Sequence, residues 1–520
     1  MNSHRLLAAM WCVIAAVIGF SLQPAYADKA EYTGASSRDI GAEWVPSGTM
    51  YTADDGTQYP YHCPFFDRAA KRLSLGNEYY FMEHDPDAKL QWKGVTRYFD
   101  YYIPNDIPDG CQLPLLMVFH GGSTDNYSMY CNLMAELADF LQLADMWKFI
   151  VVFPNGTNPA DGKSAPRSGE DDESNFHWDD CRTKRNNGSS GVDDNTPGTS
   201  VTPALERADD VGFMTGDGGL LDVMDAKLAA QGLFLDRDRI YATGASNGGM
   251  MTLRLALEAS QKVVAVAAFI TLFFYDYPYY DESTGQTEIF NGSECIAPWE
   301  MEKPVPMLLI NGTGDQWVNW DSGYVLGWVP RRGYNKKRCD PTKDKKPIYS
   351  GYGLAPQTYL DMLKNGSIGY LQYGSTITQL WPGFLSTGRE TNIYLDWFYS
   401  QADPTIHTMF FTALESGHNV PDLRSELMRD TCLYGGHIES TFDTAEMAWL
   451  FLQQYRFDAE KDVVCDPLYD DPQQADSWCE LVLESPSANA SDLLRMLRAQ
   501  KDAWANRSQN GPETTVCSEQ

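Results

Sequence analysis

Short apolar runs rich in β-formers alternate with helical stretches along the middle of this chain. Several of the runs are continuously apolar, which is typical of strands that helices cover on both faces. Two stretches between them, 220–230 and 249–259, have helical periodicity, and Gly232 is placed to end the first in a left-handed cap. The alternation predicts an α/β fold with a mostly parallel central sheet. We expect strands at 98–103, 115–119, 149–153, 239–243, 263–269, 305–310 and 408–414.

The regular pattern extends from about residue 95 to residue 457 and predicts one large domain there, with a helix opening at about Asp443 as its last element. Two stretches inside it break the alternation. Residues 158–209 are polar and rich in Gly, Ser and Asp, and residues 321–403 combine many aromatics with Gly and Pro. We expect both to be insertions, the second a candidate lid over a site. An N-terminal extension at 28–94 and an acidic C-terminal extension at 458–520, with one amphipathic helix near Leu494, complete the predicted organisation.

The first residues resemble a secretory signal. His4 and Arg5 precede an uncharged run, and Ala25-Tyr26-Ala27 supplies the small residues of a cleavage site. The run is too short to span a bilayer, so residues 1–27 predict a removed signal peptide rather than a retained anchor. Ten of the eleven cysteines follow it, an even number that suits disulfides in an oxidising compartment. We therefore expect a secreted protein, extracellular or periplasmic, without a membrane anchor.

The net charge of the chain indicates which kinds of binding partner are unlikely. Acidic residues number 71 against 40 basic ones, and the net charge of −31 repels phosphate backbones, which argues against a nucleic-acid partner. The cysteines form no CxxC pair and have no histidine at ligand spacing, so we expect no zinc. The acidic clusters at 170–173 and 193–195 are interpreted as solvated loops, with calcium binding as the alternative. The oligomeric state is left open.

The most informative segment is Gly244-Ala245-Ser246-Asn247-Gly248, a Gly-x-Ser-x-Gly pattern directly after a predicted strand and before a predicted helix. In that setting the serine sits on a tight turn whose neighbours must be small, and its hydroxyl projects over the carboxyl end of the sheet. This context predicts Ser246 as a nucleophile. The alternative is an ordinary turn serine.

A serine nucleophile needs a base and a group that orients the base, which follow in the order acid and then histidine in this type of fold. Asp315 ends a buried strand and glycine turn and is the expected acid, with Asp321 as its rival. His418 follows another predicted strand and is the expected base. His407 begins that strand, at the wrong end of the sheet, and His437 remains a rival.

The oxyanion of a tetrahedral intermediate needs hydrogen-bond donors. One is expected from the backbone of Asn247, directly after the nucleophile. The other is expected from the loop Phe119-His120-Gly121-Gly122-Ser123, where glycine lets the backbone approach a substrate, and Gly122 is our candidate. His120 is interpreted as a structural residue that shapes this loop.

With these motifs the chain resembles the secreted α/β-hydrolase esterases of the polyhydroxybutyrate depolymerase-like family, a group that includes bacterial feruloyl and acetylxylan esterases. The resemblance implies an α/β-hydrolase fold for residues 95–457, with Ser246 as nucleophile, Asp315 as orienting acid and His418 as base. The chain departs from the family in the 103-residue gap between Asp315 and His418. Because neither Ala245 nor Asn419 is cysteine, the disulfide-linked triad of fungal feruloyl esterases and tannases is not expected. The matching motifs lie at 115–123, 209–213, 239–251, 312–315 and 417–421.

These residues predict hydrolysis of a carboxylic ester through an acyl-enzyme, without metal or organic cofactor. Export favours an external substrate, such as a polyhydroxyalkanoate-like polyester or an acylated plant polysaccharide. One alternative is a serine peptidase of the prolyl-oligopeptidase type, which shares the Ser246 turn but usually carries an upstream propeller of repeats that is not evident here. The other is a catalytically inactive, surface-binding protein that keeps the hydrolase fold.

Overall fold

The structure is a computed structural model that describes residues 50–52, 58–60, 87–104, 107, 109–122, 124–126, 140–158, 163–164, 176–180, 208–274, 278–281, 286–289, 296–301, 303–322, 324–330, 345–385, 390–418, 420, 438–440 and 444–466. The predicted signal peptide, the acidic clusters, the helix near Leu494, Asn419 and His437 lie outside the described residues. Within the described part, no helix has the length and apolar character needed to cross a membrane.

An eleven-stranded sheet forms the centre of the molecule, in the order β17-β14-β15-β16-β11-β8-β7-β5-β6-β4-β3. The strands from β16 to β6 run parallel to one another, and antiparallel strands continue the sheet at both edges. The strands are β3 (Lys89–Trp92), β4 (Val95–Tyr102), β5 (Gln112–Phe119), β6 (Ile150–Pro154), β7 (Phe234–Ala245), β8 (Ala265–Phe269), β11 (Met307–Gly312), β14 (Leu371–Leu385), β15 (Glu390–Ser400), β16 (His407–Ala413) and β17 (Ile438–Ser440).

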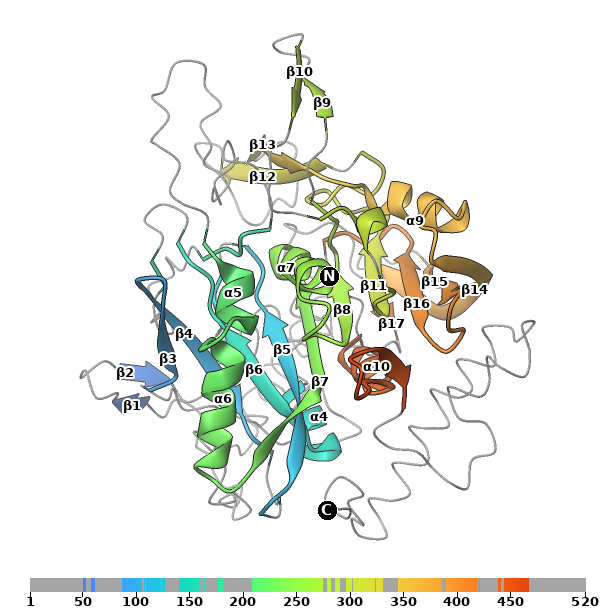
Figure 1. Ribbon diagram of the computed structural model, residues 1–520. Coiled ribbons are helices and arrows are strands. Elements are labelled where there is room, and N and C mark those ends of the chain that lie inside the picture. Colours follow the sequence, from blue (N-terminus) through green and yellow to red (C-terminus); the bar gives the residue numbers. More distant parts are fainter. Residues whose placement is uncertain are drawn as a thin grey trace, which may run out of the picture.

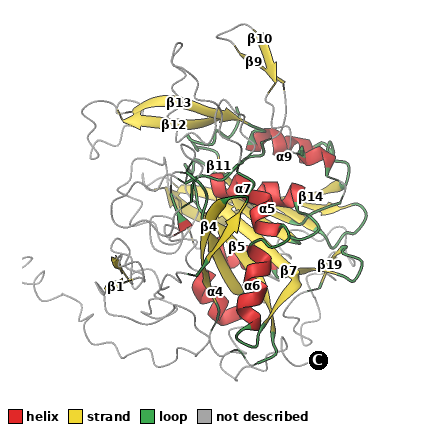
Figure 2. Cartoon of the chain, turned by 60° about the vertical axis from the view of Figure 1, so that its left-hand side comes forward, coloured by secondary structure: helices red, strands yellow, loops and turns green. Residues whose placement is uncertain are grey.

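Helices cover both faces of this sheet (Figures 1 and 2). α4 (Phe140–Trp147) and α10 (Thr444–Leu452) share one apolar cluster with Leu116 and Val118 of β5. α5 (Asp210–Thr215), α6 (Leu220–Ala229), α7 (Asn247–Glu258) and α9 (Pro356–Lys364) share the other cluster with Leu115 and Met117. Successive residues of β5 thus point to opposite buried faces, as the continuously apolar run predicts. The chain has the α/β-hydrolase fold, which confirms the predicted fold class.

The end of α6 also follows the prediction. Gly232 has φ +73°, in the left-handed region. Its N–H donates to the carbonyl of Ala229 at 3.1 Å, and the N–H of Leu233 donates to the carbonyl of Leu228 at 3.0 Å. These two bonds are those of a Schellman cap, which turns the chain from α6 into β7.

The interpretation of 321–403 as one insertion is wrong for its second half. β14 and β15 belong to the central sheet, and β15 pairs with β16 along its length. Ile393, Leu395 and Trp397 of β15 are buried in the core, so the aromatic and branched residues here serve a strand rather than a lid. At the other end, β3 belongs to the same sheet, so the domain begins before residue 95.

Two antiparallel hairpins project beyond the carboxyl ends of the parallel strands (Figures 1 and 2). They are β9 (Pro278–Asp281) with β10 (Gln286–Ile289), and β12 (Tyr324–Pro330) with β13 (Lys345–Tyr352). The first half of the predicted insertion therefore lies at the end of the sheet where sites of this fold are found. Two smaller pairs are β1 (Met50–Thr52) with β2 (Gln58–Pro60), and β18 (Tyr455–Phe457) with β19 (Val463–Cys465).

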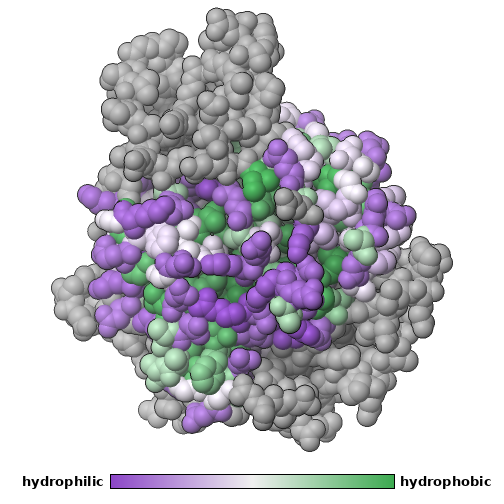
Figure 3. All heavy atoms as spheres, in the orientation of Figure 1, coloured by the Kyte–Doolittle hydropathy of each residue, from purple (hydrophilic) through white to green (hydrophobic). Residues whose placement is uncertain are grey.

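Hydrophilic residues dominate the described surface that Figure 3 shows, with apolar residues in small separate patches. Among the described residues, the exposed large apolar side chains are Phe234, Ile296, Trp299 and Tyr373. Ile296 and Trp299 share one segment, whereas Phe234 and Tyr373 lie in β7 and β14, and a few exposed apolar side chains of this kind are normal for a globular surface.

Candidate active site

Ser246 alone forms the turn between β7 and α7. Its φ of 57° and ψ of −122° are rare for a residue with a side chain and mark local backbone strain. Two hydrogen bonds hold the turn: the Ser246 N–H donates to the Phe269 carbonyl at 3.0 Å, and the Met250 N–H donates to the Ser246 carbonyl at 2.9 Å. The strained turn holds the hydroxyl at the carboxyl end of the sheet, as the sequence context predicts.

Glycine is required on both sides of the serine. A Cβ on Gly248 would lie 2.3 Å from the Phe119 carbonyl oxygen, and one on Gly244 would lie 2.7 Å from the Gly248 carbonyl carbon. Both distances are far shorter than any real Cβ contact. The expectation that this turn needs small neighbours is therefore confirmed.

The structure brings Ser246, His418 and Asp315 together. His418 Nε2 lies 2.9 Å from Ser246 Oγ, and His418 Nδ1 lies 2.7 Å from Asp315 Oδ2. The carboxylate can only accept, so Nδ1 carries the proton and Nε2 is left to accept from the serine hydroxyl. The other carboxylate oxygen accepts from the N–H groups of Trp317 at 2.8 Å and Val318 at 2.9 Å, which fixes the carboxylate in place.

Asp315 and His418 are 103 positions apart in sequence but close in space, because β11 and β16 are neighbouring parallel strands that end at the same edge. The loops that follow these strands are also bonded to each other. The Gly314 N–H donates to the Ser416 carbonyl at 2.8 Å, and a Cβ on Gly312 would meet that same oxygen at 2.3 Å. The intervening chain forms β12, β13, α9, β14 and β15.

Asp321, the alternative acid, and His407 lie among the described residues but away from Ser246. Asp321 is exposed in the loop after β11, and its backbone N–H donates to the side chain of Asn319 at 3.3 Å. His407 begins β16, at the opposite end of the sheet, and is fully buried with Nε2 3.0 Å from the Pro404 carbonyl. Burial lowers the pKa of His407 to about 4, so it is neutral at pH 7.

The loop after β5 adjoins the serine. A Cβ on Gly121 would lie 3.8 Å from the Cβ of Ser246, and one on Gly122 would lie 3.5 Å from the Cβ of Asn247. The two backbone donors expected for an oxyanion, at Gly122 and Asn247, therefore come from adjacent residues of different elements.

His120 shapes this loop from inside the molecule. Its Nδ1 donates to the Gly121 carbonyl at 2.7 Å, and its Nε2 accepts from the Gly156 N–H at 3.0 Å. The ring is fully buried, and burial lowers its pKa to about 4, so the neutral imidazole makes both bonds. This arrangement supports the structural role expected of His120.

Two parts of the surroundings were missed by sequence reasoning. Trp317 lies beside the imidazole of His418, with ring centroids 6.2 Å apart and planes inclined by 29°. Residues 176–180 lie against α7, although the interpretation of 158–209 placed them in a polar loop. Trp178 in this segment is 1% exposed and is hydrogen-bonded to Asn247. The available signal was the aromatic run Phe176-His177-Trp178 within an otherwise polar stretch.

Buried ion pairs hold this segment in place. Arg254 of α7 pairs with Asp179 at 3.1 Å and with Glu258 at 2.7 Å. The Asp179 N–H donates to Asp210, which pairs with the buried Arg97 at 2.6 Å. Burial raises the pKa of Asp210 and the Arg97 charge opposes that rise. Such pairs tie segments together because breaking one leaves a buried charge without its partner.

One family model matches part of the chain: the prolyl oligopeptidase family, over residues 208–326. That stretch contains Ser246 and Asp315 but not His418. No curated protein sequence matches the chain.

Several solved structures that resemble this one are described as esterases or hydrolases. An acetyl xylan esterase from Aspergillus awamori is 15% identical, with a TM-score of 0.32 over 64% of this chain and 94% of that one. A ferulic acid esterase from Anaeromyces mucronatus is 14% identical, with a TM-score of 0.30 over 66% and 85%. An S-formylglutathione hydrolase from Agrobacterium tumefaciens is 16% identical, with a TM-score of 0.28 over 44% and 75%. Likenesses this weak assign no substrate, and the resemblance to polyhydroxybutyrate depolymerases stays a prediction.

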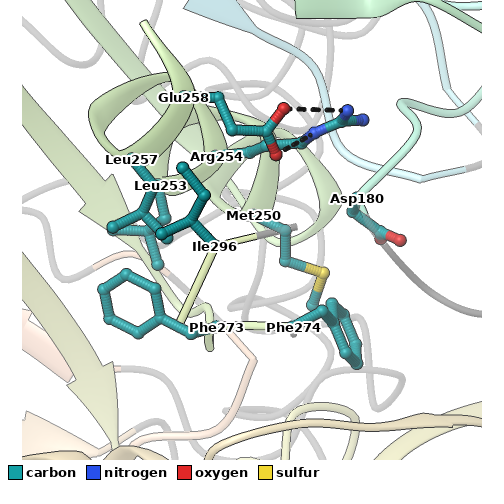
Figure 4. A pocket seen from close by; sticks show the side chains of 9 residues that line it. All are labelled: Asp180, Met250, Leu253, Arg254, Leu257, Glu258, Phe273, Phe274 and Ile296. Atoms are coloured by element: carbon teal, nitrogen blue, oxygen red, sulfur yellow. Dashed lines mark hydrogen bonds and ion pairs between the residues drawn. The ribbon is translucent and has the colours of Figure 1, made fainter. Parts of the chain in front are cut away.

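A pocket lies against α7, one helical turn beyond Ser246 (Figure 4). Its wall is mostly apolar, and the Arg254–Glu258 pair and Asp180 supply the polar groups. The lining residues are Asp180, Met250, Leu253, Arg254, Leu257, Glu258, Phe273, Phe274 and Ile296. Among the described residues, no group of three or more His, Cys, Asp or Glu side chains is arranged to hold a metal ion.

Proposed function

We propose that this protein hydrolyses carboxylic esters through an acyl-enzyme formed on Ser246. The observation that carries the proposal is the continuous hydrogen-bonded line from Ser246 Oγ through the His418 ring to Asp315, with separations of 2.9 and 2.7 Å, at a strained strand-to-helix turn. A serine hydroxyl becomes a useful nucleophile only when a base is placed to take its proton.

In this proposal Ser246 Oγ attacks the ester carbonyl carbon while His418 Nε2 takes its proton. Asp315 holds the tautomer and stabilises the imidazolium. The negative oxygen of the tetrahedral intermediate accepts from the backbone N–H groups of Asn247 and Gly122. His418 then gives the proton to the departing alcohol, and a water molecule, activated by the same imidazole, releases the acid and restores the serine.

We further propose that the protein is exported and acts on an external ester, either a polyhydroxyalkanoate-like polyester or an acylated plant polysaccharide. The signal-like segment at 1–27 supports export. Cys111 and Cys465 are each disulfide-bonded, which fits an oxidising compartment. The motifs shared with secreted esterases, from the glycine loop after β5 to the Ser246 turn, support the substrate class.

A serine peptidase is the second candidate, because the family model that matches 208–326 is that of the prolyl oligopeptidases. The two chemistries share the nucleophile and differ in the leaving group. Turnover of p-nitrophenyl butyrate together with inertness toward proline anilides supports the esterase, and the reverse pattern supports the peptidase.

The substrate experiment uses the exported full-length protein on a panel of polyhydroxybutyrate film, methyl ferulate and acetylated xylan. We expect release of acid from at least one of these, abolished by Ser246→Ala and unchanged by Ser322→Ala, which alters an exposed serine in the loop after β11. Ester hydrolysis that survives Ser246→Ala would overturn the proposal.

A further inference from the structure

The two proposed oxyanion donors belong to separate elements, and nothing in the covalent chain fixes the spacing between them. Gly122 lies in the loop after β5, whereas Asn247 begins α7. Stabilisation of an oxyanion requires both N–H groups to point at one place within about 0.5 Å. Direct packing of Gly248 on the end of β5 brings the loop and the helix start together, and a group bonded to both can fix the spacing of the two donors.

Trp178 contacts both elements. Its backbone N–H donates to the side-chain oxygen of Asn247 at 2.8 Å, and its carbonyl accepts from the Asn247 side-chain nitrogen at 3.2 Å. Its indole N–H donates to the carbonyl of His120 at 3.0 Å. The indole also packs against the rings of His120 and Phe119, with centroids 4.8 and 5.1 Å away. Trp178 is thus hydrogen-bonded to the start of α7 through its backbone and to the loop after β5 through its side chain.

The residues around Trp178 keep it from moving. His177 exchanges backbone hydrogen bonds with Thr157, at 2.9 and 3.1 Å. The Asp179 carbonyl accepts from the Arg254 guanidinium at 2.7 Å, and the Asp179 N–H donates to Asp210 at 2.6 Å. Asp180 accepts a further bond from the Asn247 side chain at 2.6 Å. Trp178 therefore sits on a frame that is tied to the sheet, α5 and α7.

We propose that Trp178 is a positioning residue for the oxyanion hole, setting the distance between the N–H groups of Gly122 and Asn247. This inference rests on the proposed function. Removing the indole N–H leaves the buried His120 carbonyl without that donor, and the free-energy cost of an unsatisfied buried acceptor favours a shift of the loop that finds it another donor. Because Gly121 and Gly122 follow His120 directly, such a movement changes the aim of the Gly122 N–H.

The test is Trp178→Phe, which keeps an aromatic ring and removes the indole donor. We expect kcat for p-nitrophenyl butyrate to fall by about tenfold to a hundredfold, somewhat less than outright loss of an oxyanion donor. KM should stay within about threefold, because the lost interaction acts in the transition state. A purely structural role would lower stability without this split between kcat and KM.

Trp449→Phe is the matched control. Trp449 is as buried as Trp178 but lies in α10, in the apolar cluster on the other face of the sheet, and its indole N–H has no hydrogen-bond partner within the part of the chain described. We expect the Trp178 variant to be the less stable of the two, because it leaves the His120 carbonyl without that donor, and we expect only the Trp178 variant to lose kcat. Equal kcat losses in both variants would overturn the proposal.

Asn247→Ala is a second, independent test that remains decisive even where Trp178→Phe folds poorly. It removes the side chain that is hydrogen-bonded to the Trp178 backbone and keeps the Asn247 backbone N–H, the proposed oxyanion donor. We therefore expect kcat to fall again, with KM nearly unchanged. An unchanged kcat in Asn247→Ala overturns the positioning role. Failure of the proposed function is distinguishable, because in that case Ser246→Ala would retain hydrolysis, whereas failure of this inference leaves Ser246→Ala inactive.

Discussion

Replacing Gly248 with alanine would place a methyl group against the backbone where the end of β5 meets the start of α7. The new Cβ would lie 2.3 Å from the Phe119 carbonyl oxygen and 2.4 Å from that of His120. Because Cβ atoms essentially never approach a heavy atom closer than 3.0 Å, the end of β5 would have to retreat by about 0.7 Å. Alanine gains about 1 kcal/mol over glycine in a helix, but overpacking of this kind costs about 1–3 kcal/mol or more, so the clash prevails.

The displaced carbonyl groups belong to Phe119 and His120, which directly precede the loop that carries Gly122. We therefore expect kcat to fall by more than the loss of folding stability alone would cause. A shift of this size can reduce turnover by about a hundredfold. We would measure kcat for p-nitrophenyl butyrate and the urea midpoint for Gly248→Ala and for Gly369→Ala. Gly369 is exposed, and a Cβ there would meet no atom within 4 Å, so its variant should behave as wild type. Wild-type kcat in Gly248→Ala would refute the account of a closely packed turn.

Two further perturbations test other parts of the structure. Asp315→Asn keeps an oxygen that accepts from the N–H groups of Trp317 and Val318, but its amide NH₂ faces His418. The NH₂ donates to Nδ1, so the proton of the ring moves to Nε2, which can then no longer accept from the serine. Steady-state kinetics should show kcat reduced by about 10⁴-fold, and a loss under tenfold would contradict the hydrogen-bonded arrangement. His407→Gln tests the effect of burying this histidine. In the unfolded chain the imidazole binds a proton below about pH 6.5, whereas in the native state it does so only below about pH 4. The free energy of unfolding of the wild type therefore falls as pH falls from 6.5 to 4. Urea titrations should show wild type losing about 2 kcal/mol more than His407→Gln between pH 8 and pH 5, and equal losses would contradict the low pKa.

The sequence was sufficient to predict the strands on which the site is built. Continuous apolar runs at β5, β8 and β11 are visible without knowledge of the fold, because parallel strands are buried on both faces. Gly244 and Gly248 around Ser246 have a local steric cause, so the turn is readable from a few letters. Asp315 and His418 follow from the same logic, since residues after parallel strands gather at one edge.

The remainder depends on contacts that no local pattern encodes. The stretch that holds β14 and β15 resembled a loop because its aromatics are mixed with Gly and Pro, some of which lie in β14 itself. The strands are defined by pairing: β15 pairs with β16, and β14 pairs with β15. Trp178 lies in a stretch whose composition is that of a loop. Its place is set through its neighbour Asp179, which pairs with Arg254 and whose N–H donates to Asp210; both partners are distant in sequence.

The most direct measurement of the central claim is covalent labelling of the native exported protein with a fluorophosphonate, followed by peptide mass spectrometry. The Ser246–His418–Asp315 arrangement predicts one adduct per chain, on Ser246, with labelling slowed by about a thousandfold or more in His418→Ala. A native protein that remains unlabelled, an adduct on another residue, or a labelling rate unaffected by His418→Ala would contradict the claim that these side chains act as one catalytic unit.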